Sequence, residues 1–137
     1  MILLDTSGLL AAVDADEPKH AAAAKALRDA EPPLVLSPFV LAELDYLLAT
    51  RRGQAAELTV LEEVATGAYQ LETFDRADVA AALRLMRQYS DIDIGLADAS
   101  VVILADRYDI SEVLTLDERH FRIVRRGNGR PFRLLPG

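Results

Sequence analysis

The sequence contains no cysteine and has only two histidines, His20 and His120. Without cysteine there can be no disulfide framework, thiolate zinc site, dithiol redox motif or cysteine nucleophile. Two histidines are also too few for a structural zinc site of the usual composition. The absences therefore remove thiol chemistry and structural zinc from consideration.

Long hydrophobic runs are missing as well. No apolar stretch approaches the roughly 18 to 20 residues that a bilayer-spanning helix needs. The first residues, MILLDTSG, lack the basic start of a secretory signal peptide. We expect a cytoplasmic protein that does not associate with membranes.

Basic residues are in deficit: 15 Lys and Arg stand against 22 Asp and Glu, for a net charge of −7. Such a charge argues against a general nucleic-acid-binding surface, so a polyanionic ligand would need local compensation. Divalent metal ions are one source of it. The other is a C-terminal group of six arginines that could grip phosphate: Arg119, Arg122, Arg125, Arg126, Arg130 and Arg133.

The length of 137 residues, of which 51% are hydrophobic and 27% charged, predicts one compact domain over residues 1–137. Five short apolar runs are typical of strands, at residues 1–4, 34–36, 69–71, 113–116 and 132–135. The segments between them have helical composition, at residues 7–13, 18–30, 38–52, 54–66, 75–89 and 93–108. Strands alternating with helices in this way predict an α/β domain with a mostly parallel sheet.

Residues at the helix boundaries support this division. Pro18 is expected to open the second helix, and Ser37 followed by Pro38 is typical of an N-cap with proline at the first helical position. Gly53 is expected to end that third helix. Asp93 is interpreted as the cap of the last long helix, and residues 126–130 as a hairpin-like turn before the final strand.

Four carboxylates occupy positions that need an explanation. Asp5 and Asp117 directly follow predicted strands, at the edge where parallel sheets bind ligands. Glu43 and Asp98 lie in helices that are largely apolar, with no Lys or Arg three or four residues away to neutralise them. Burying an unpaired carboxylate is costly, so we predict that the four acids share one pocket.

Converging acids repel one another unless a cation joins them. Oxygen ligands favour Mg²⁺, with Mn²⁺ able to substitute, over zinc. Two such ions suit the in-line displacement of a phosphodiester bond. Because the chain has no phosphate-binding loop of the GxxxxGK type, hydrolysis is favoured over phosphoryl transfer.

Each acid also has a purely structural interpretation. Asp5 and Asp117 could cap the helical segments that follow them, and Asp98 could be a first-turn acid favoured by the helix dipole. Glu43 could reach solvent at an exposed edge of its helix. Asp45, two residues further on, points to a different face.

Several neighbours of the acids are secondary candidates. Asp93 could lie in the outer shell of a metal instead of capping a helix. The hydroxyls of Thr6, Ser7 and Thr115 could orient a metal-bound water or serve as caps. His120 could contact substrate, or it could only pack or face solvent.

Four segments resemble PIN domains, and in particular the VapC-type toxins of bacterial toxin–antitoxin modules. They are Ile2-Leu-Leu-Asp-Thr-Ser7, Val40-Leu-Ala-Glu-Leu-Asp-Tyr46, Leu96-Ala-Asp-Ala99 and Leu114-Thr-Leu-Asp-Glu-Arg-His-Phe121. Each motif alone is weak, but four in this order and spacing are specific. The resemblance covers essentially the whole chain.

The resemblance implies that Asp5, Glu43, Asp98 and Asp117 are the catalytic and metal-binding residues of a Mg²⁺- or Mn²⁺-dependent endoribonuclease. It further implies a three-layer α/β/α fold, with five strands in the order 3-2-1-4-5. The implied substrate is structured RNA, either transfer RNA or the sarcin–ricin loop of large ribosomal RNA, cut to leave a 5′-phosphate and a 3′-hydroxyl.

The implied partners are a second copy of the chain, in a homodimer, and a VapB-type antitoxin whose C-terminal segment blocks the cleft. The complex with antitoxin would be a heterotetramer or larger. The charge of −7 suits a basic antitoxin segment whose arginine pairs with the pocket acids.

Three other functions compete with this interpretation. A phosphoacceptor signalling domain requires a lysine near the strand ends, but Lys19 and Lys25 both lie in the predicted second helix. A haloacid-dehalogenase-like phosphatase requires Asp-x-Asp after the first strand, where this chain has Asp5-Thr6-Ser7. A catalytically silent, dimeric PIN-fold binding module stays open as the alternative.

Overall fold

A computed structural model describes residues 1–137 and contains one five-stranded sheet in which all the strands are parallel. The strand order is β3-β2-β1-β4-β5, as the resemblance implied. The strands are β1 (Ile2–Leu4), β2 (Leu34–Leu36), β3 (Gln70–Leu71), β4 (Glu112–Leu114) and β5 (Arg133–Leu135). The predicted α/β class and parallel sheet are therefore confirmed.

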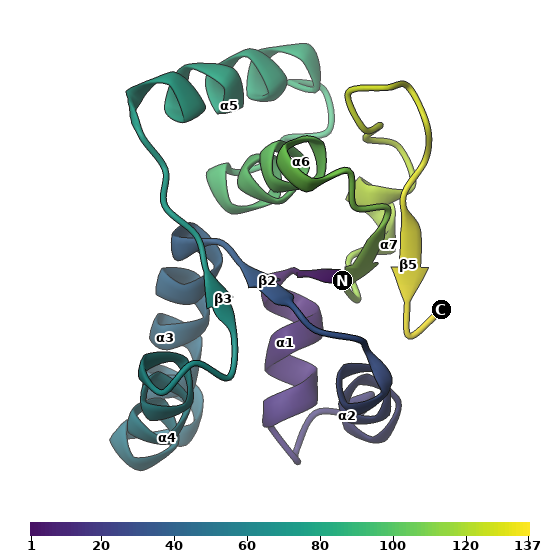
Figure 1. The fold of residues 1–137 in the computed structure, drawn as a ribbon. Coiled ribbons are helices and arrows are strands. Elements are labelled where there is room, and N and C mark those ends of the chain that lie inside the picture. Colours follow the sequence, from purple (N-terminus) through teal and green to yellow (C-terminus); the bar gives the residue numbers. More distant parts are fainter.

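The sheet is the middle layer of three, and seven helices lie around it (Figure 1). In Figure 1, α5 and α6 lie on one face, and α1 and α2 lie on the other. The helix α3 contacts both α1 and α6 and pairs with α4, so it bridges the two outer layers. The bounds are α1 (Thr6–Val13), α2 (His20–Asp29), α3 (Pro38–Arg52), α4 (Gln54–Ala65), α5 (Arg76–Gln88), α6 (Leu96–Tyr108) and α7 (Glu118–Phe121).

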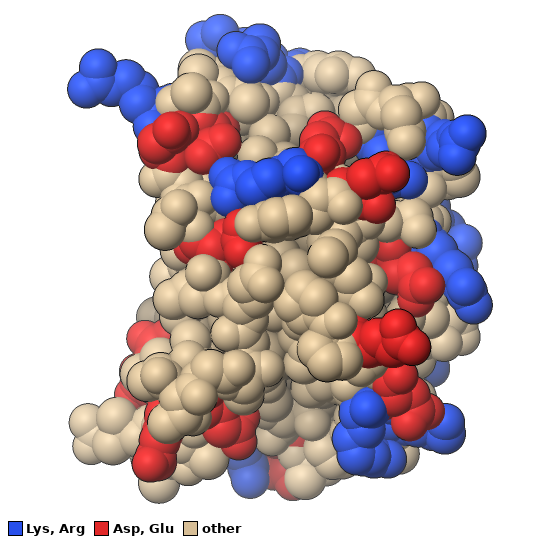
Figure 2. All heavy atoms as spheres, viewed as in Figure 1, with Lys and Arg blue, Asp and Glu red and all other residues tan.

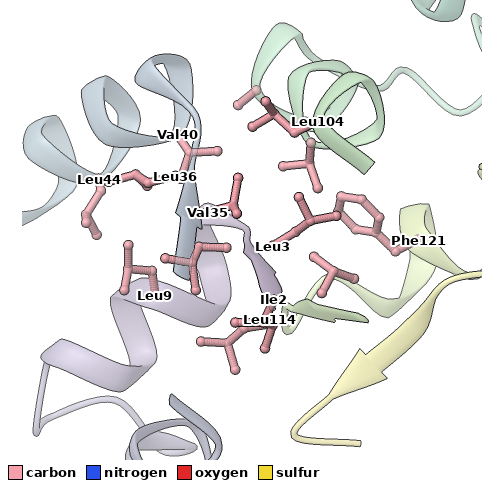
Figure 3. Packing of buried hydrophobic residues seen from close by; sticks show 14 of the residues in the cluster. Ile2, Leu3, Leu9, Val35, Leu36, Val40, Leu44, Leu104, Leu114 and Phe121 are labelled. Carbon is pink, nitrogen blue, oxygen red and sulfur yellow. The ribbon is translucent and has the colours of Figure 1, made fainter. Parts of the chain in front are cut away.

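The central strand β1 anchors the core because it is covered on both faces. Its three residues are at most 1% exposed, as expected for a parallel strand whose sequence is continuously apolar. Leu3 pairs with Val35 of β2 and with Val113 of β4. Figure 3 shows side chains from α1, α3, α6 and α7 packing around this centre.

The predicted boundaries of α3 are confirmed. The Ser37 hydroxyl accepts a hydrogen bond from the amide of Phe39 at 3.1 Å, Pro38 is the first helical residue, and Gly53 ends the helix with φ +92°. Ser37 also contacts Ser100 of α6, with 2.6 Å between the two hydroxyl oxygens. This buried contact places α3 against α6.

Two predicted helix starts are wrong. The helix α2 begins at His20, after a turn that contains Pro18. Asp93 does not cap α6, because a turn at residues 91–93 leaves Asp93 in the left-handed region with φ 58° and makes Gly95 the N-cap. Aspartate is among the few residues that adopt the left-handed region readily. The residues around Asp93 gave no sign that it would do so here.

The ends of the sheet differ in detail from the prediction. The strand β4 stops at Leu114, so Asp117 lies three residues beyond its end and caps α7 instead. The turn before β5 is confirmed, since the Arg126 amide donates to the Arg130 carbonyl at 3.0 Å. None of the helices has the length and apolar character needed to span a bilayer.

We predict that Gly8→Ala destabilises the fold strongly. A Cβ at Gly8 would overlap the backbone of Leu114 and lie 2.7 Å from the amide nitrogen of Thr115, so α1 would be forced away from β4. We expect a loss of about 3 kcal/mol in the free energy of unfolding, measured by urea denaturation. Gly95→Ala is the matched control, because a Cβ there meets nothing, and it should cost under about 1 kcal/mol. Equal effects would contradict the packing argument.

Candidate metal centre

A cavity of about 340 Å³ lies beside the carboxyl end of β1 and is lined by all four acids singled out from the sequence. Asp5 follows β1, Glu43 is in α3, Asp98 is in the first turn of α6 and Asp117 caps α7. These elements are far apart in the chain. The fold therefore brings four separate carboxylates to one place.

Asp5 is the most buried of the four, with 3% of its surface exposed. It occupies the N-cap position of α1, yet its side chain makes no capping hydrogen bond. Instead its Oδ2 accepts hydrogen bonds from the hydroxyls of Thr115 at 2.7 Å and Ser7 at 3.1 Å. The carboxylate thus points toward the cavity and away from the helix terminus.

The two hydroxyls extend this network into the loop before α7. The amide of Leu116 donates to the Ser7 hydroxyl and the amide of Asp117 donates to the Thr115 hydroxyl, both at 2.9 Å. Asp5 and the backbone that carries Asp117 are therefore positioned together. Ser7 and Thr115 hold the Asp5 carboxylate in place. The sequence had suggested only that their hydroxyls orient a metal-bound water or cap a helix.

Burial raises the pKa of Asp5 to about 7, and the nearby Asp98 carboxylate adds to the rise. The hydrogen bonds from Thr115 and Ser7 act in the opposite direction but do not cancel it. Burial is also the largest influence on Asp98 and raises its pKa. The backbone amide of Gly95 and the His120 ring oppose that rise, whereas Asp117 adds to it.

Asp98 and Asp117 each serve a helix and the cavity at once. The Gly95 amide donates to Oδ2 of Asp98 at 3.3 Å, at the start of α6. The His120 amide donates to Oδ1 of Asp117 at 3.2 Å, at the start of α7. The structural and functional interpretations of these two acids are therefore compatible.

Glu43 differs from the other three acids. It is exposed, as one interpretation of the sequence expected, and no side chain pairs with its carboxylate. Because it also lines the cavity, it is an acid at the rim that can approach a ligand held deeper in the site.

The sequence did not predict a specific role for His120, and the structure places its ring beside two of the acids. Its Nδ1 lies 3.2 Å from Oδ2 of Asp98 and 3.0 Å from Oδ2 of Asp117. The three side chains form a group whose ligand atoms all lie within 4.8 Å of one another. The available signal was a histidine three residues after a candidate ligand, within the short helical turn expected at residues 118–121.

Arg51 and Glu17 also line the cavity and were missed. They form an ion pair with 3.4 Å between Nη1 and Oε1. Glu43, Leu47 and Arg51 are spaced four residues apart, which places them on one face of α3 and could have revealed Arg51. Nothing in the sequence pointed to Glu17.

The C-terminal arginines do not form the single surface that was expected. Arg126 is buried against Asp109, Arg122 pairs with Glu118 at 3.3 Å, and Arg133 lies 3.8 Å from Glu112. On the face shown in Figure 2, basic side chains are interspersed with acidic ones. Of the six, Arg119 lines a second cavity, of about 690 Å³, together with Asp117 and Lys19.

The second cavity adjoins the first. Ser7, Leu116 and Asp117 line both of them. A ligand that occupied both would therefore meet carboxylates on one side of Asp117 and the cations Lys19 and Arg119 on the other.

The residues around the first cavity fit divalent metal ions. Four carboxylates supply the oxygen ligands that Mg²⁺ and Mn²⁺ accept. The Thr6 hydroxyl is buried at the cavity without a hydrogen-bond partner. Nδ1 of His120, beside Asp98 and Asp117, is also buried without one, and His120 borders a separate cavity. A buried polar atom without a partner is uncommon, and an ion with its water shell held by the acids would satisfy such an atom.

Comparison with known proteins gives a match to one family and to one of its ribonucleases. Residues 2–126 match the family model of the PIN domain. Ribonuclease VapC26 of Mycobacterium tuberculosis is 48% identical over 135 residues, which cover 98% of this chain and all of that protein.

Two solved structures share the fold. One is VapC20 of Mycobacterium tuberculosis, described as a toxin that cleaves the sarcin–ricin loop, with a TM-score of 0.80 and 20% identity over 85% of this chain and 90% of its own. The other is VapBC2 of Rickettsia felis bound to a promoter DNA fragment, with a TM-score of 0.67 and 15% identity over 98% of both chains.

We predict that Asp5→Asn stabilises the metal-free protein in a pH-dependent way. The pKa of Asp5 is about 7 in the fold against an ordinary value of 3.8, so between these values the native state binds a proton that the unfolded state has released. Stability then falls as pH rises through this window. The neutral amide avoids the loss, so the gain over wild type should be small at pH 4 and reach up to about 4 kcal/mol at pH 8.

Urea denaturation in EDTA across this pH range measures the effect. Asp91→Asn, at an exposed position, is the control and should show no such trend. A variant that is less stable than wild type at pH 8 would show that the ionised Asp5 supports the fold.

Proposed function

The chain belongs to the PIN domain family, in its VapC branch, and from this premise we propose that it is an endoribonuclease that requires Mg²⁺ or Mn²⁺. One observation carries the proposal: Asp5, Glu43, Asp98 and Asp117 line a single cavity. The 48% identity to a ribonuclease over nearly the whole chain supports it. We further propose that residues 1–137 act as one PIN domain.

The proposed reaction is hydrolysis of a phosphodiester bond to a 5′-phosphate and a 3′-hydroxyl. Divalent ions, when bound, would lower the pKa of the attacking water and stabilise charge on the entering and leaving oxygens. In this chain Asp5, Asp98 and Asp117 would hold them from the inner wall of the cavity, and Glu43 from its rim. Ser7 and Thr115 would keep the Asp5 carboxylate directed at the cavity.

A structured RNA is the proposed substrate, with transfer RNA and the sarcin–ricin loop as the two candidates. The net charge of −7 means that the general field of the protein repels RNA. Binding must then depend on local contacts, and the cavity lined by Lys19 and Arg119 beside Asp117 supplies them.

The proposed partners are a second copy of the chain and a VapB-type antitoxin, in a heterotetramer or larger complex in the cytoplasm. The Rickettsia felis neighbour was solved as a VapBC complex, and its fold is shared over 98% of both chains. A basic antitoxin segment would be attracted to the exposed Glu43 and to the acids behind it.

We predict that the purified protein cuts total bacterial RNA at a discrete site with Mg²⁺ or Mn²⁺ and not with EDTA. Asp5→Asn and Asp98→Asn should lower the cleavage rate at least about 100-fold, because each removes a charge that holds the ions. Mapping of the new RNA ends would identify the target and show whether they carry 5′-phosphates. Asp91→Asn should cleave as wild type does.

Cleavage that survives EDTA, or that is unchanged in Asp98→Asn, would overturn the proposed function. If the protein binds RNA without cutting it under any metal, the silent binding module is the correct interpretation.

We also predict that Arg119→Ala weakens RNA binding by about three- to tenfold and lowers the slope of affinity against salt by about one, as loss of a phosphate contact does. Binding is measured in the Asp98→Asn background so that RNA stays intact. Arg133→Ala is the control, since Arg133 faces Glu112 and lines neither cavity. Equal losses from both variants would show that only net charge matters.

A further inference from the structure

His120 occupies a position that the proposed function does not yet use. It is 8% exposed and belongs to α7, whose first turn is held by the hydrogen bond from its own amide to Asp117. The next residue, Phe121, is 1% exposed and packs edge-to-face on Phe132 with 5.7 Å between the ring centres. The helix is therefore anchored in the core, and the imidazole is held beside the acids.

The contacts of Nδ1 are close but poorly directed for hydrogen bonds. It lies 3.0 Å from Asp117 Oδ2 and 3.2 Å from Asp98 Oδ2, yet it is buried without a hydrogen-bond partner. His20 shows the contrast, since its Nδ1 contacts the Ala11 carbonyl at 2.8 Å in a regular hydrogen bond. The His120 ring is therefore held close to both acids without a well-directed hydrogen bond to either.

A cation shared by the three side chains would fit these distances. Adjacent ligands of an octahedral ion with bonds of about 2.1 Å lie about 3 Å from each other. The separations of Nδ1 from the two carboxylate oxygens agree with this spacing. We propose that Nδ1 of His120 is a direct ligand of a divalent ion held between Asp98 and Asp117, an inference that rests on the proposed metal-dependent function.

A nitrogen ligand changes which ion the centre prefers. Mg²⁺ is bound mainly by oxygen, whereas imidazole is a common ligand of first-row transition ions. With His120 in the ligand set, the centre favours Mn²⁺ over Mg²⁺ more strongly than four carboxylates would by themselves. His120 is then the residue that determines metal preference.

Pulsed electron paramagnetic resonance of the Mn²⁺-loaded full-length chain tests the ligand directly. The signal should carry the hyperfine coupling of a bound imidazole nitrogen, and this coupling should change when histidine is labelled with ¹⁵N. Because the chain has only two histidines, His20→Gln leaves His120 as the sole source and should keep the coupling. His120→Gln should abolish it.

Calorimetric titration with Mn²⁺ and with Mg²⁺ tests the preference. We expect His120→Gln to weaken Mn²⁺ binding about tenfold and Mg²⁺ binding at most about threefold. A change in the ratio of the two affinities distinguishes a ligand from a residue that only shapes the site. The coupling in wild-type protein stands as evidence even if the substitution impairs folding.

Mn²⁺ binding without a nitrogen coupling would overturn the inference and leave His120 as an ion-pairing or packing residue, while metal-dependent cleavage could still be observed. Equal weakening of both ions in a folded His120→Gln protein would contradict the assigned preference. Failure of wild type to bind either ion, together with cleavage that survives EDTA, would reject the proposed function itself.

Discussion

The burial of the Asp5 carboxylate at the end of the central strand is the constraint on which the site depends. β1 is enclosed by β2, β4 and the helices on both faces, so the residue that follows it has little access to water. The hydroxyls of Ser7 and Thr115 donate hydrogen bonds to the Asp5 carboxylate in place of water. The same hydroxyls accept hydrogen bonds from the backbone amides of Leu116 and Asp117. One desolvated carboxylate thereby links β1 to the loop after β4, which places Asp117 at the cavity and His120 beside Asp98 and Asp117.

The same side chains cap helices and line the cavity. A carboxylate has two oxygens and several lone pairs, so accepting one backbone amide leaves capacity for a further ligand. Asp117 accepts the His120 amide through Oδ1 while its Oδ2 faces the His120 ring. Asp98 accepts the Gly95 amide and still approaches both Asp117 and His120. The caps hold the two acids at the cavity wall, which explains why the two interpretations of each acid could not be separated from the sequence.

Much of the fold could be predicted because its signals are local. Ser37, Pro38 and Gly53 mark the ends of α3 through backbone chemistry that acts within a few residues. The start of α6 was mispredicted because Asp93 adopts a left-handed conformation that depends on the turn around it. The four acids that line the cavity could be singled out from their unusual settings. The placement of His120 against two of them could not, because it depends on the packing of α7 through Phe121. Contacts between distant segments, such as that of Ser7 with Thr115, leave no periodic trace in a single sequence.

The negative charge of the protein can be reconciled with RNA binding through the way its cations are used. Arg107 pairs with Glu72 and Asp78 at 3.0 Å, Arg52 pairs with Asp14 and Asp16, and Arg126 is buried against Asp109. These arginines tie elements together and cannot also form a broad basic surface. Long-range attraction is then weak, so the RNA of the proposed function would be held by short-range contacts at the two adjoining cavities. Under the proposed function, such a protein would select its substrate by fit at the site, and the same acids that repel RNA at a distance would attract the metal ions that cleavage requires.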